Sequence, residues 1–231
     1  MTEKSEGTLL WEPSEEFKAN TTITRYMEWL KNEKGHDFAD YAALWEWSVT
    51  DLEGFWESVW EYGGIEAAKP YESVISERKM PGAEWFSGAE LNYAEHAFLR
   101  ARDDEPAIIS RSEIRPLSEM SWGELREKTA ALAAGLRELG VGRGDRVVAY
   151  IPNVPEALVA LLACASLGAV WSSCSPDFGV GSVVDRFKQI EPKVLLAVDG
   201  YRYGGKDYDR TDVVARLQRE IPSLEKTIVL P

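Results

Sequence analysis

The chain has 231 residues, enough for one large domain or two small ones, and a formal net charge of −13 at pH 7. This acidity argues against nucleic acid or an anionic membrane as the main partner. The acidity is concentrated in residues 1–85, where 18 acidic residues stand against 8 basic ones. A ligand made of phosphates is therefore expected to prefer the rest of the chain.

Residues 1–85 predict a helical, tryptophan-rich N-terminal extension that packs on the main domain. A polar arm is expected over residues 1–20, and Thr22 is expected to cap a helix with an apolar face. A second helix is expected over residues 37–47. Thr50 and Glu53 have the spacing of a capping box, which would begin a third helix that ends at Gly63-Gly64.

Seven of the nine tryptophans lie in residues 1–85. Two interpretations remain open. The rings could form an aromatic surface that binds a partner or a carbohydrate, or several short helices could use them to cover the main domain. The second interpretation is favoured, because most of these tryptophans sit among helical apolar positions.

Residues 86–231 predict an α/β fold, a parallel β-sheet flanked by helices. After a helix from Leu91 to Arg100, two short strands over 106–110 and 117–120 are expected to form a hairpin. Ser121 and Glu124 form a second capping box, which would begin a long helix that ends at Gly140. Four buried-type strands are then expected, over residues 146–151, 169–173, 194–198 and 227–230.

Helical patterns separate these four strands, and such crossovers make parallel sheets. Asn153 and Thr211 are expected to cap the helices that follow them, with Pro155 in a first helical turn. Because the chain ends just after a strand, it is expected to be a first α/β subdomain truncated at its C-terminal end. Such a piece, expressed alone, is expected to be aggregation-prone.

The two cysteines, Cys164 and Cys174, provide neither a disulfide framework nor a metal site, and His36 and His96 have no ligand partner at usable spacing. No metal site is therefore expected in the chain. Residues 1–6 are too polar for a signal peptide, and the most apolar segment, 157–170, is too short to cross a membrane. These features predict a cytoplasmic protein with free thiols.

Ligands of parallel sheets bind where the carboxyl ends of the strands open into loops, here residues 152–155, 174–181 and 199–209. Gly200 to Lys206 has most of the spacing of a Walker A loop, but Asp207 stands where Ser or Thr must hold magnesium. A glycine pattern over 140–144 precedes a strand and is rejected as a dinucleotide fingerprint. Arg202 and Lys206 around a Gly-Gly pair still suit an anion, and a solvated turn with incidental charges is the alternative.

The order of several segments resembles the adenylate-forming acyl-CoA synthetases. Two of these segments, 175–180 and 185–193, are similar in sequence to the branch of that family that acts on acetoacetate. The resemblance covers nearly the whole chain from about Trp11 and rests on these segments: Trp85–Asn92, Leu139–Asn153, Pro155-Glu156, Ala163–Val170, Ser175–Val180 and Asp185–Lys193.

The resemblance implies the N-terminal part of an AMP-forming acid–thiol ligase. Such an enzyme converts acetoacetate, ATP with Mg²⁺ and coenzyme A into acetoacetyl-CoA, AMP and pyrophosphate. It also implies two groups of CoA contacts. The phosphorylated end of CoA would meet Arg202, Tyr203, Gly204, Gly205 and Lys206, and its adenine would meet Ser175, Pro176 and Asp177.

One departure affects this site: the family's second cation, expected two positions after Tyr203, is replaced by Gly205, with Lys206 next. The family's phosphate loop, ribose-binding Asp and catalytic Lys have no counterpart in these 231 residues. No catalytic residue is assigned, and the chain alone is expected to be inactive. The alternatives are a stand-alone nucleotide- or CoA-binding module without catalysis, and a synthetase for acetate or propionate; the oligomeric state is not predicted.

Overall fold

The computed structural model describes residues 7–230, and the chain divides into two compact units, residues 1–91 and 92–231. The polar segment 1–6, judged unlike a signal peptide, and Pro231 lie outside the described residues. No helix in the described range is long and apolar enough to cross a membrane.

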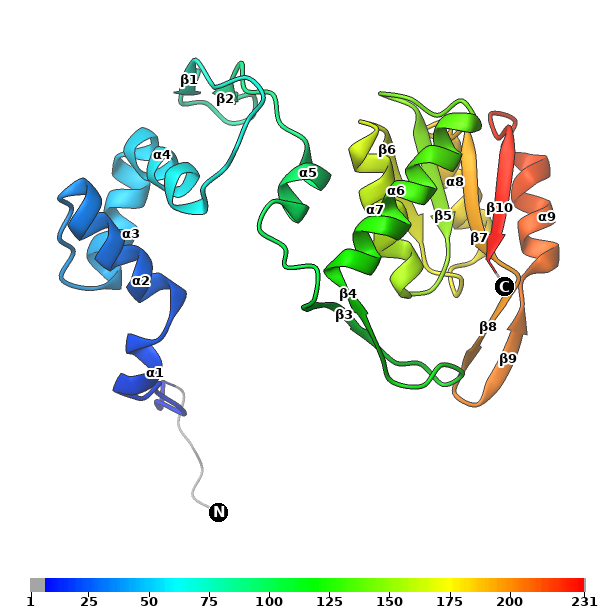
Figure 1. Cartoon of the computed structure of the whole chain (residues 1–231), viewed down its shortest axis with the longest axis horizontal. Coiled ribbons are helices and arrows are strands. Elements are labelled where there is room, and N and C mark those ends of the chain that lie inside the picture. The colour runs from blue at the N-terminus through cyan, green and yellow to red at the C-terminus, as the bar shows by residue number, and fades with distance from the viewer. Residues whose placement is uncertain (1–6, 231) are drawn as a thin grey trace. The chain divides into compact units, whose positions relative to one another are not determined.

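The first unit is mainly helical, as expected, and includes one small antiparallel hairpin, β1–β2, that the sequence did not predict. Its elements, drawn in blue to cyan in Figure 1, are α1 (Glu15–Ala19), α2 (Thr22–Trp29), the π-helix η1 (Leu30–Lys34), α3 (Tyr41–Thr50), α4 (Leu52–Gly63), β1 (Ser73–Ile75) and β2 (Trp85–Ser87).

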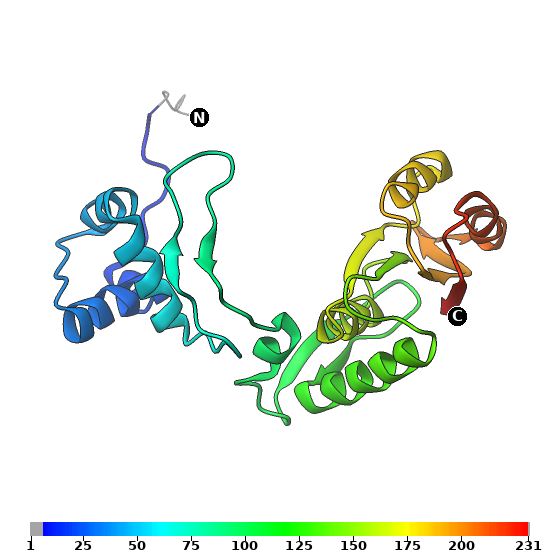
Figure 2. The ribbon, with the colours of Figure 1, turned by 90° about the horizontal axis from the view of Figure 1, so that it is seen from above.

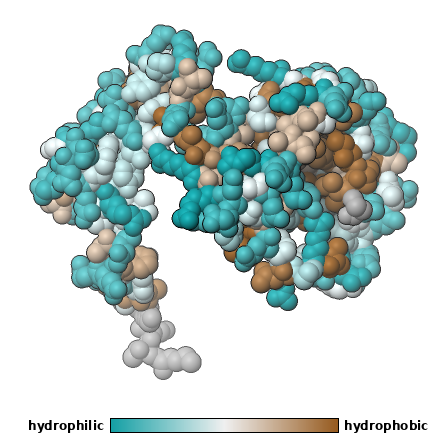
Figure 3. Space-filling view, viewed as in Figure 1, coloured by the Kyte–Doolittle hydropathy of each residue, from teal (hydrophilic) through white to brown (hydrophobic). Residues whose placement is uncertain are grey.

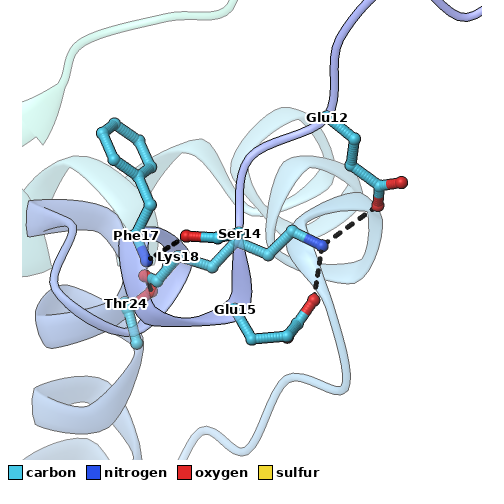
Figure 4. Close-up of polar contacts among 6 residues, drawn as sticks. All are labelled: Glu12, Ser14, Glu15, Phe17, Lys18 and Thr24. Carbon is cyan, nitrogen blue, oxygen red and sulfur yellow. Dashed lines mark hydrogen bonds and ion pairs between the residues drawn. The ribbon is translucent and has the colours of Figure 1, made fainter.

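The expected polar arm contains a short helix, α1. The hydroxyl of Ser14 accepts a hydrogen bond from the backbone N–H of Phe17 and so caps the helix, as Figure 4 shows. Lys18 lies between the carboxylates of Glu12 and Glu15, at 3.1 and 2.8 Å. These local contacts satisfy the helix end, so a segment with no apolar period can still be helical.

The core of the first unit is an aromatic cluster around the buried side chains of Tyr26, Leu30 and Leu44. The Tyr26 hydroxyl shares a 2.5 Å hydrogen bond with the buried Ser58 hydroxyl. Partly buried rings of Trp29 and Trp47 pack on this cluster, among other side chains, whereas Trp11, Trp45, Trp56 and Trp85 are exposed.

The predicted capping box at Thr50 is wrong. Thr50 is the last residue of α3, and its hydroxyl donates to the carbonyl oxygen of Glu46. Asp51 caps α4 instead, because its carboxylate accepts from the N–H of Gly54. The two helices follow each other without a loop, so the residue that the capping pattern singled out belongs to the preceding helix.

The second unit contains a four-stranded parallel sheet with the order β10-β7-β5-β6, which confirms the predicted α/β fold with a sheet flanked by helices. The elements of this unit are α5 (Tyr93–Phe98), β3 (Pro106–Ser110), β4 (Ser118–Ser121), α6 (Trp122–Glu138), β5 (Arg146–Tyr150), α7 (Pro155–Ser166), β6 (Val170–Cys174), α8 (Val180–Lys188), β7 (Val194–Val198), β8 (Gly200–Tyr203), β9 (Lys206–Asp209), α9 (Thr211–Glu220) and β10 (Lys226–Leu230).

Alternate residues of β5 and β7 point into two separate cores. Val147 and Ala149 of β5 pack with α6 and α7, while Val148 and Tyr150 pack with α8 and α9. Figures 1 and 2 show these helix pairs on opposite faces of the sheet. Because both faces are covered, the strands consist of nearly continuous apolar residues, which made them recognisable in the sequence.

The edge strands remain partly open. Val170 of β6 and Val229 of β10 are 48% and 50% exposed, and the space-filling view shows apolar side chains at the surface of the second unit (Figure 3). Exposed apolar edges favour association with other chains. These edges agree with the expected aggregation of the chain expressed alone, which stays a prediction.

The long helix α6 has the predicted ends. Ser121 and Glu124 make both hydrogen bonds of a capping box, and Gly140 follows the helix with a φ of +79°. The expected β3–β4 hairpin is also present and antiparallel. The capping pattern gives the right helix start here because Ser121 stands directly before the first helical residue, Trp122.

Two other predicted caps are wrong. Val154, not Asn153, precedes α7, where Pro155 occupies the first turn as predicted. Thr211 is already helical, and its N–H and hydroxyl both donate to the carboxylate of Asp209. In both cases the polar residue lies one position away from the cap, so the helix begins one residue later or earlier than the pattern indicated.

The glycine-rich loop over 140–144 has a structural role. The Asp145 carboxylate accepts a 2.9 Å hydrogen bond from the N–H of Gly142, which is the main cause of its lowered pKa. Lys193 lies 3.5 Å from that carboxylate and donates to the carbonyl oxygen of Gly140 at 2.6 Å. These bonds join the loop before β5 to the residue before β7, at the amino ends of both strands.

Candidate functional site

A cleft of about 770 Å³ lies at the carboxyl ends of the parallel strands. The strand order places β6 on one side of β5 and β7 on the other, so the chain reverses its winding direction at β5. The loops that follow β5 and β7 then diverge, and a crevice forms between them. The lining residues are Ser112, Ile114, Arg115, residues 152–154, 175–177, 198–203 and 207–209, Thr211 and Leu230.

The segment after β7, predicted to be a loop, is a β-hairpin. Strands β8 and β9 pair with Tyr203 opposite Lys206, so Gly204 and Gly205 form a two-residue turn. Both glycines have positive φ angles, +60° and +72°, as tight hairpin turns of this kind require. A Gly-Gly pair between alternating tyrosines is a hairpin signal that could have identified this element.

Arg202 lines the cleft, but its guanidinium already has a partner. It donates two hydrogen bonds, of 2.6 and 2.7 Å, to the carboxylate of Asp207 directly across the hairpin. The pair raises the pKa of Arg202 and lowers that of Asp207, in each case mainly through this hydrogen bonding. Both side chains are exposed, so water and salt weaken the pair and a phosphate can compete for the arginine.

The hairpin turn also has an anionic partner. The N–H groups of Gly204 and Gly205 donate to the two carboxylate oxygens of Glu113, at 2.7 and 2.8 Å. Glu113 lies in the loop between β3 and β4, which approaches the β8–β9 hairpin in Figure 1. Two successive backbone N–H groups that point at one carboxylate form an anion-binding turn.

The loop after β6 is fixed by a buried hydroxyl and an arginine. Tyr150, 1% exposed, donates its hydroxyl to the carbonyl oxygen of Pro176 at 2.6 Å, and burial raises the pKa of that hydroxyl. Arg210 donates to the same oxygen through Nε at 2.8 Å and to the Tyr201 hydroxyl at 3.0 Å. Its guanidinium also lies over the stacked rings of Tyr201 and Tyr208.

The structure brings most of the predicted site residues to one place. Ser175, Pro176, Asp177, Arg202 and Tyr203 line the cleft. The remaining three, Gly204, Gly205 and Lys206, form the exposed tip of the hairpin beside it. The predicted segment is therefore continuous with the cleft, and its roles in ligand binding stay predictions.

Several polar residues of the site were missed in the sequence. Arg115 lines the cleft from the β3–β4 loop, and its Nη1 donates to both carboxylate oxygens of Glu156, at 2.8 and 2.9 Å. Tyr201 and Arg210 were missed as well, although an arginine directly after a Tyr-rich hairpin was a usable signal. Nothing local in the sequence connects Glu113 with a turn 91 residues later.

The cysteines do not add chemistry to the site. Both thiols are free and buried, and burial alone raises the pKa of Cys164 to about 12, so it stays protonated at neutral pH. Within residues 7–230 no cluster of three or more His, Cys, Asp or Glu side chains could hold a metal ion. No Mg²⁺ ligand is assigned among the described residues.

Comparison with known families identifies the class of protein. The model of the AMP-binding enzyme family matches residues 95–230, and that of the acetyl-coenzyme A synthetase N-terminus matches residues 41–97. The first match covers more than half of the chain. The chain therefore belongs to the AMP-binding enzyme family.

Individual relatives are more specific. The chain is 40% identical to the acetoacetyl-CoA synthetase of Danio rerio over 98% of this chain and 34% of that protein. It is 34% identical to a malonamoyl-CoA synthetase of Penicillium aethiopicum over 96% of this chain and 31% of that protein. Among solved structures, acetoacetyl-CoA synthetase from Streptomyces lividans matches with 51% identity and a TM-score of 0.92, over 96% of this chain and 35% of that one. The chain thus spans about a third of the length of these relatives.

Proposed function

We propose that this chain is the N-terminal portion of an AMP-forming acid–thiol ligase that makes acetoacetyl-CoA from acetoacetate, ATP and CoA, with Mg²⁺ accompanying ATP. The observation that carries the proposal is the 51% identity and TM-score of 0.92 with the Streptomyces lividans acetoacetyl-CoA synthetase. Membership of the AMP-binding enzyme family supports the use of ATP and CoA. We assign no catalytic residue to this portion.

Within that enzyme, we assign the cleft and the β8–β9 hairpin to the nucleotide end of CoA. CoA supplies the thiol that takes the acyl group, and its nucleotide end carries the phosphates. The fixed charge of Arg202 and the N–H groups of Gly204 and Gly205 suit those phosphates, and Lys206 adds a cation at the hairpin tip. Ser175 to Asp177 would meet the adenine, on a loop that Tyr150 and Arg210 hold in place.

The decisive test is a ligase assay on the full-length protein that contains this chain. Acetoacetate with ATP, Mg²⁺ and CoA should give acetoacetyl-CoA and AMP, and acetate and propionate should serve as poorer acyl donors. The matched control is the 231-residue chain alone, which should release no AMP. A preference for acetate or propionate would replace the proposed substrate. Binding of CoA with no AMP released from any acid would favour a module without catalysis.

The remaining parts of the proposal concern the cell. We infer a cytoplasmic location, since both described cysteines are free, buried thiols. The net charge of −13 supports small-molecule substrates over nucleic acid or anionic membranes. Fractionation of cells that carry the tagged full-length protein tests the location.

A further inference from the structure

The Glu113 carboxylate binds the two turn N–H groups of the β8–β9 hairpin, which are the donors best suited to an external anion. Its two carboxylate oxygens accept from the N–H groups of Gly204 and Gly205, and no side chain of the turn itself satisfies these donors. A Cβ built on either glycine would have no neighbouring atom within 4 Å, so no other part of the described chain packs on the Cα side of the turn. A phosphate oxygen would need the same two donors that the carboxylate now uses.

We propose that Glu113 is an internal competitor for the phosphates of the ligand. Its carboxylate occupies the Gly204–Gly205 turn in the free protein and must leave when a phosphorylated nucleotide binds there. Glu113 thereby lowers the affinity of the site for such nucleotides. The inference rests on the proposed function, because it assumes that the cleft takes the nucleotide end of CoA.

The surroundings of Glu113 allow this exchange without unfolding. Its side chain is exposed, while the loop that carries it is held by other contacts. Arg115 binds Glu156 with two hydrogen bonds, and the Ser112 hydroxyl accepts from the N–H groups of Ile114 and Arg115. The carboxylate can therefore rotate away from the turn while the loop stays in place.

The neighbouring charges favour replacement of a carboxylate by a phosphate. Arg202, on the same hairpin, is attracted to Glu113 as well as to Asp207. A phosphate at the turn would bring more negative charge and more acceptor oxygens to Arg202 and the two N–H groups than one carboxylate does. Lys206 follows the turn directly and adds a further cation.

Calorimetric titration of the full-length protein with adenosine 3′,5′-bisphosphate tests the competition. Glu113→Gln and Glu113→Ala should each bind the bisphosphate about three- to tenfold more tightly than the unchanged protein. Glu119→Gln is the matched control. It removes one negative charge from an exposed position of β4, the strand that follows the Glu113 loop, without touching the Gly204–Gly205 turn. It should change the affinity less than twofold. Equal or weaker binding by both Glu113 variants would overturn the inference.

Amide hydrogen exchange, followed on the peptide that contains residues 200–209, tests the contact without any ligand. Loss of the carboxylate in Glu113→Ala should speed exchange at Gly204 and Gly205 severalfold, and Glu119→Gln should not. Unchanged exchange would overturn the inference and leave the proposed function standing. If exchange speeds up but no protein binds the bisphosphate, both the competition and the CoA assignment of the cleft are wrong. The ligase assay then decides separately whether the enzyme activity stands.

Discussion

Arg210 should stabilise the second unit more than its partial exposure suggests. It lies between the hairpin and the loop after β6, and it contacts the Pro176 carbonyl, the Tyr201 hydroxyl and two tyrosine rings. Arg210→Ala would remove all of these contacts at once. The Pro176 carbonyl oxygen would keep its bond from Tyr150, so no buried acceptor would be left unpaired.

The expected loss follows from these contacts. A hydrogen bond from a charged donor at 2.8 Å contributes about 1.5 kcal/mol when the group is only half-buried. The ring contacts at a partly exposed site add about 0.5–1 kcal/mol. The free energy of unfolding should therefore fall by about 2 kcal/mol in Arg210→Ala, since neighbouring contacts do not add fully. Arg210→Lys keeps the charge but not the planar fork, so its loss should be intermediate.

The assay is denaturant-dependent hydrogen exchange of the β7 peptide, which reports unfolding of the parallel sheet. Arg216→Ala is the matched control, because this arginine of α9 makes one exposed pair with Glu220, four residues later in the same helix. Its effect should be small. The reasoning fails if Arg210→Ala costs no more stability than Arg216→Ala.

Three further predictions concern the fold and the cleft. Ser121→Ala should lower the free energy of unfolding by about 1 kcal/mol, because it removes the cap of α6; Ser110→Ala, which loses only an exposed hydroxyl contact, is the control in the same exchange assay. Arg202→Ala should raise the Michaelis constant for CoA about three- to tenfold, which is less than for an unpaired arginine because the Arg202 guanidinium also binds Asp207. Acetoacetate-dependent pyrophosphate exchange should stay unchanged. Loss of that exchange would show that Arg202 serves the ATP site or the structure. Asp145 has a lowered pKa in the folded chain, so its contribution to stability is present above the unfolded pKa of about 3.9 and is lost as the pH falls through the lower folded pKa. Asp145→Asn should therefore make the free energy of unfolding depend less on pH in that acid range. An unchanged pH dependence would contradict this.

The strands of the parallel sheet were predictable because their signal is local. Arg146–Tyr150 and Val194–Val198 are buried on both faces, and such strands consist of consecutive apolar residues. The strand order was not predictable, because no residue of β5 specifies that β6 pairs on one side of it and β7 on the other. The packing of the helical extension on the sheet, and the boundary after residue 85, stay predictions.

The site was predictable only in part. Arg202 and the Gly-Gly pair were found because strand ends and glycines are visible in the sequence. Their partners were not, since Glu113 approaches from a loop that is distant in the chain and carries no motif. The Arg202–Asp207 pair depends on the hairpin register, which places the two residues opposite each other. A loop over residues 199–209, as the sequence predicts, carries no such register.

The distribution of tryptophans has a consequence for spectroscopy. Seven of the nine indoles lie in the first unit, and the second unit contains only Trp122 and Trp171, neither of which lines the cleft. Intrinsic fluorescence will therefore report mainly on the helical unit. A ligand that enters the cleft should leave the emission almost unchanged. A fluorescence melting curve would be dominated by the first unit, and the unit that carries the cleft would contribute only through Trp122 and Trp171.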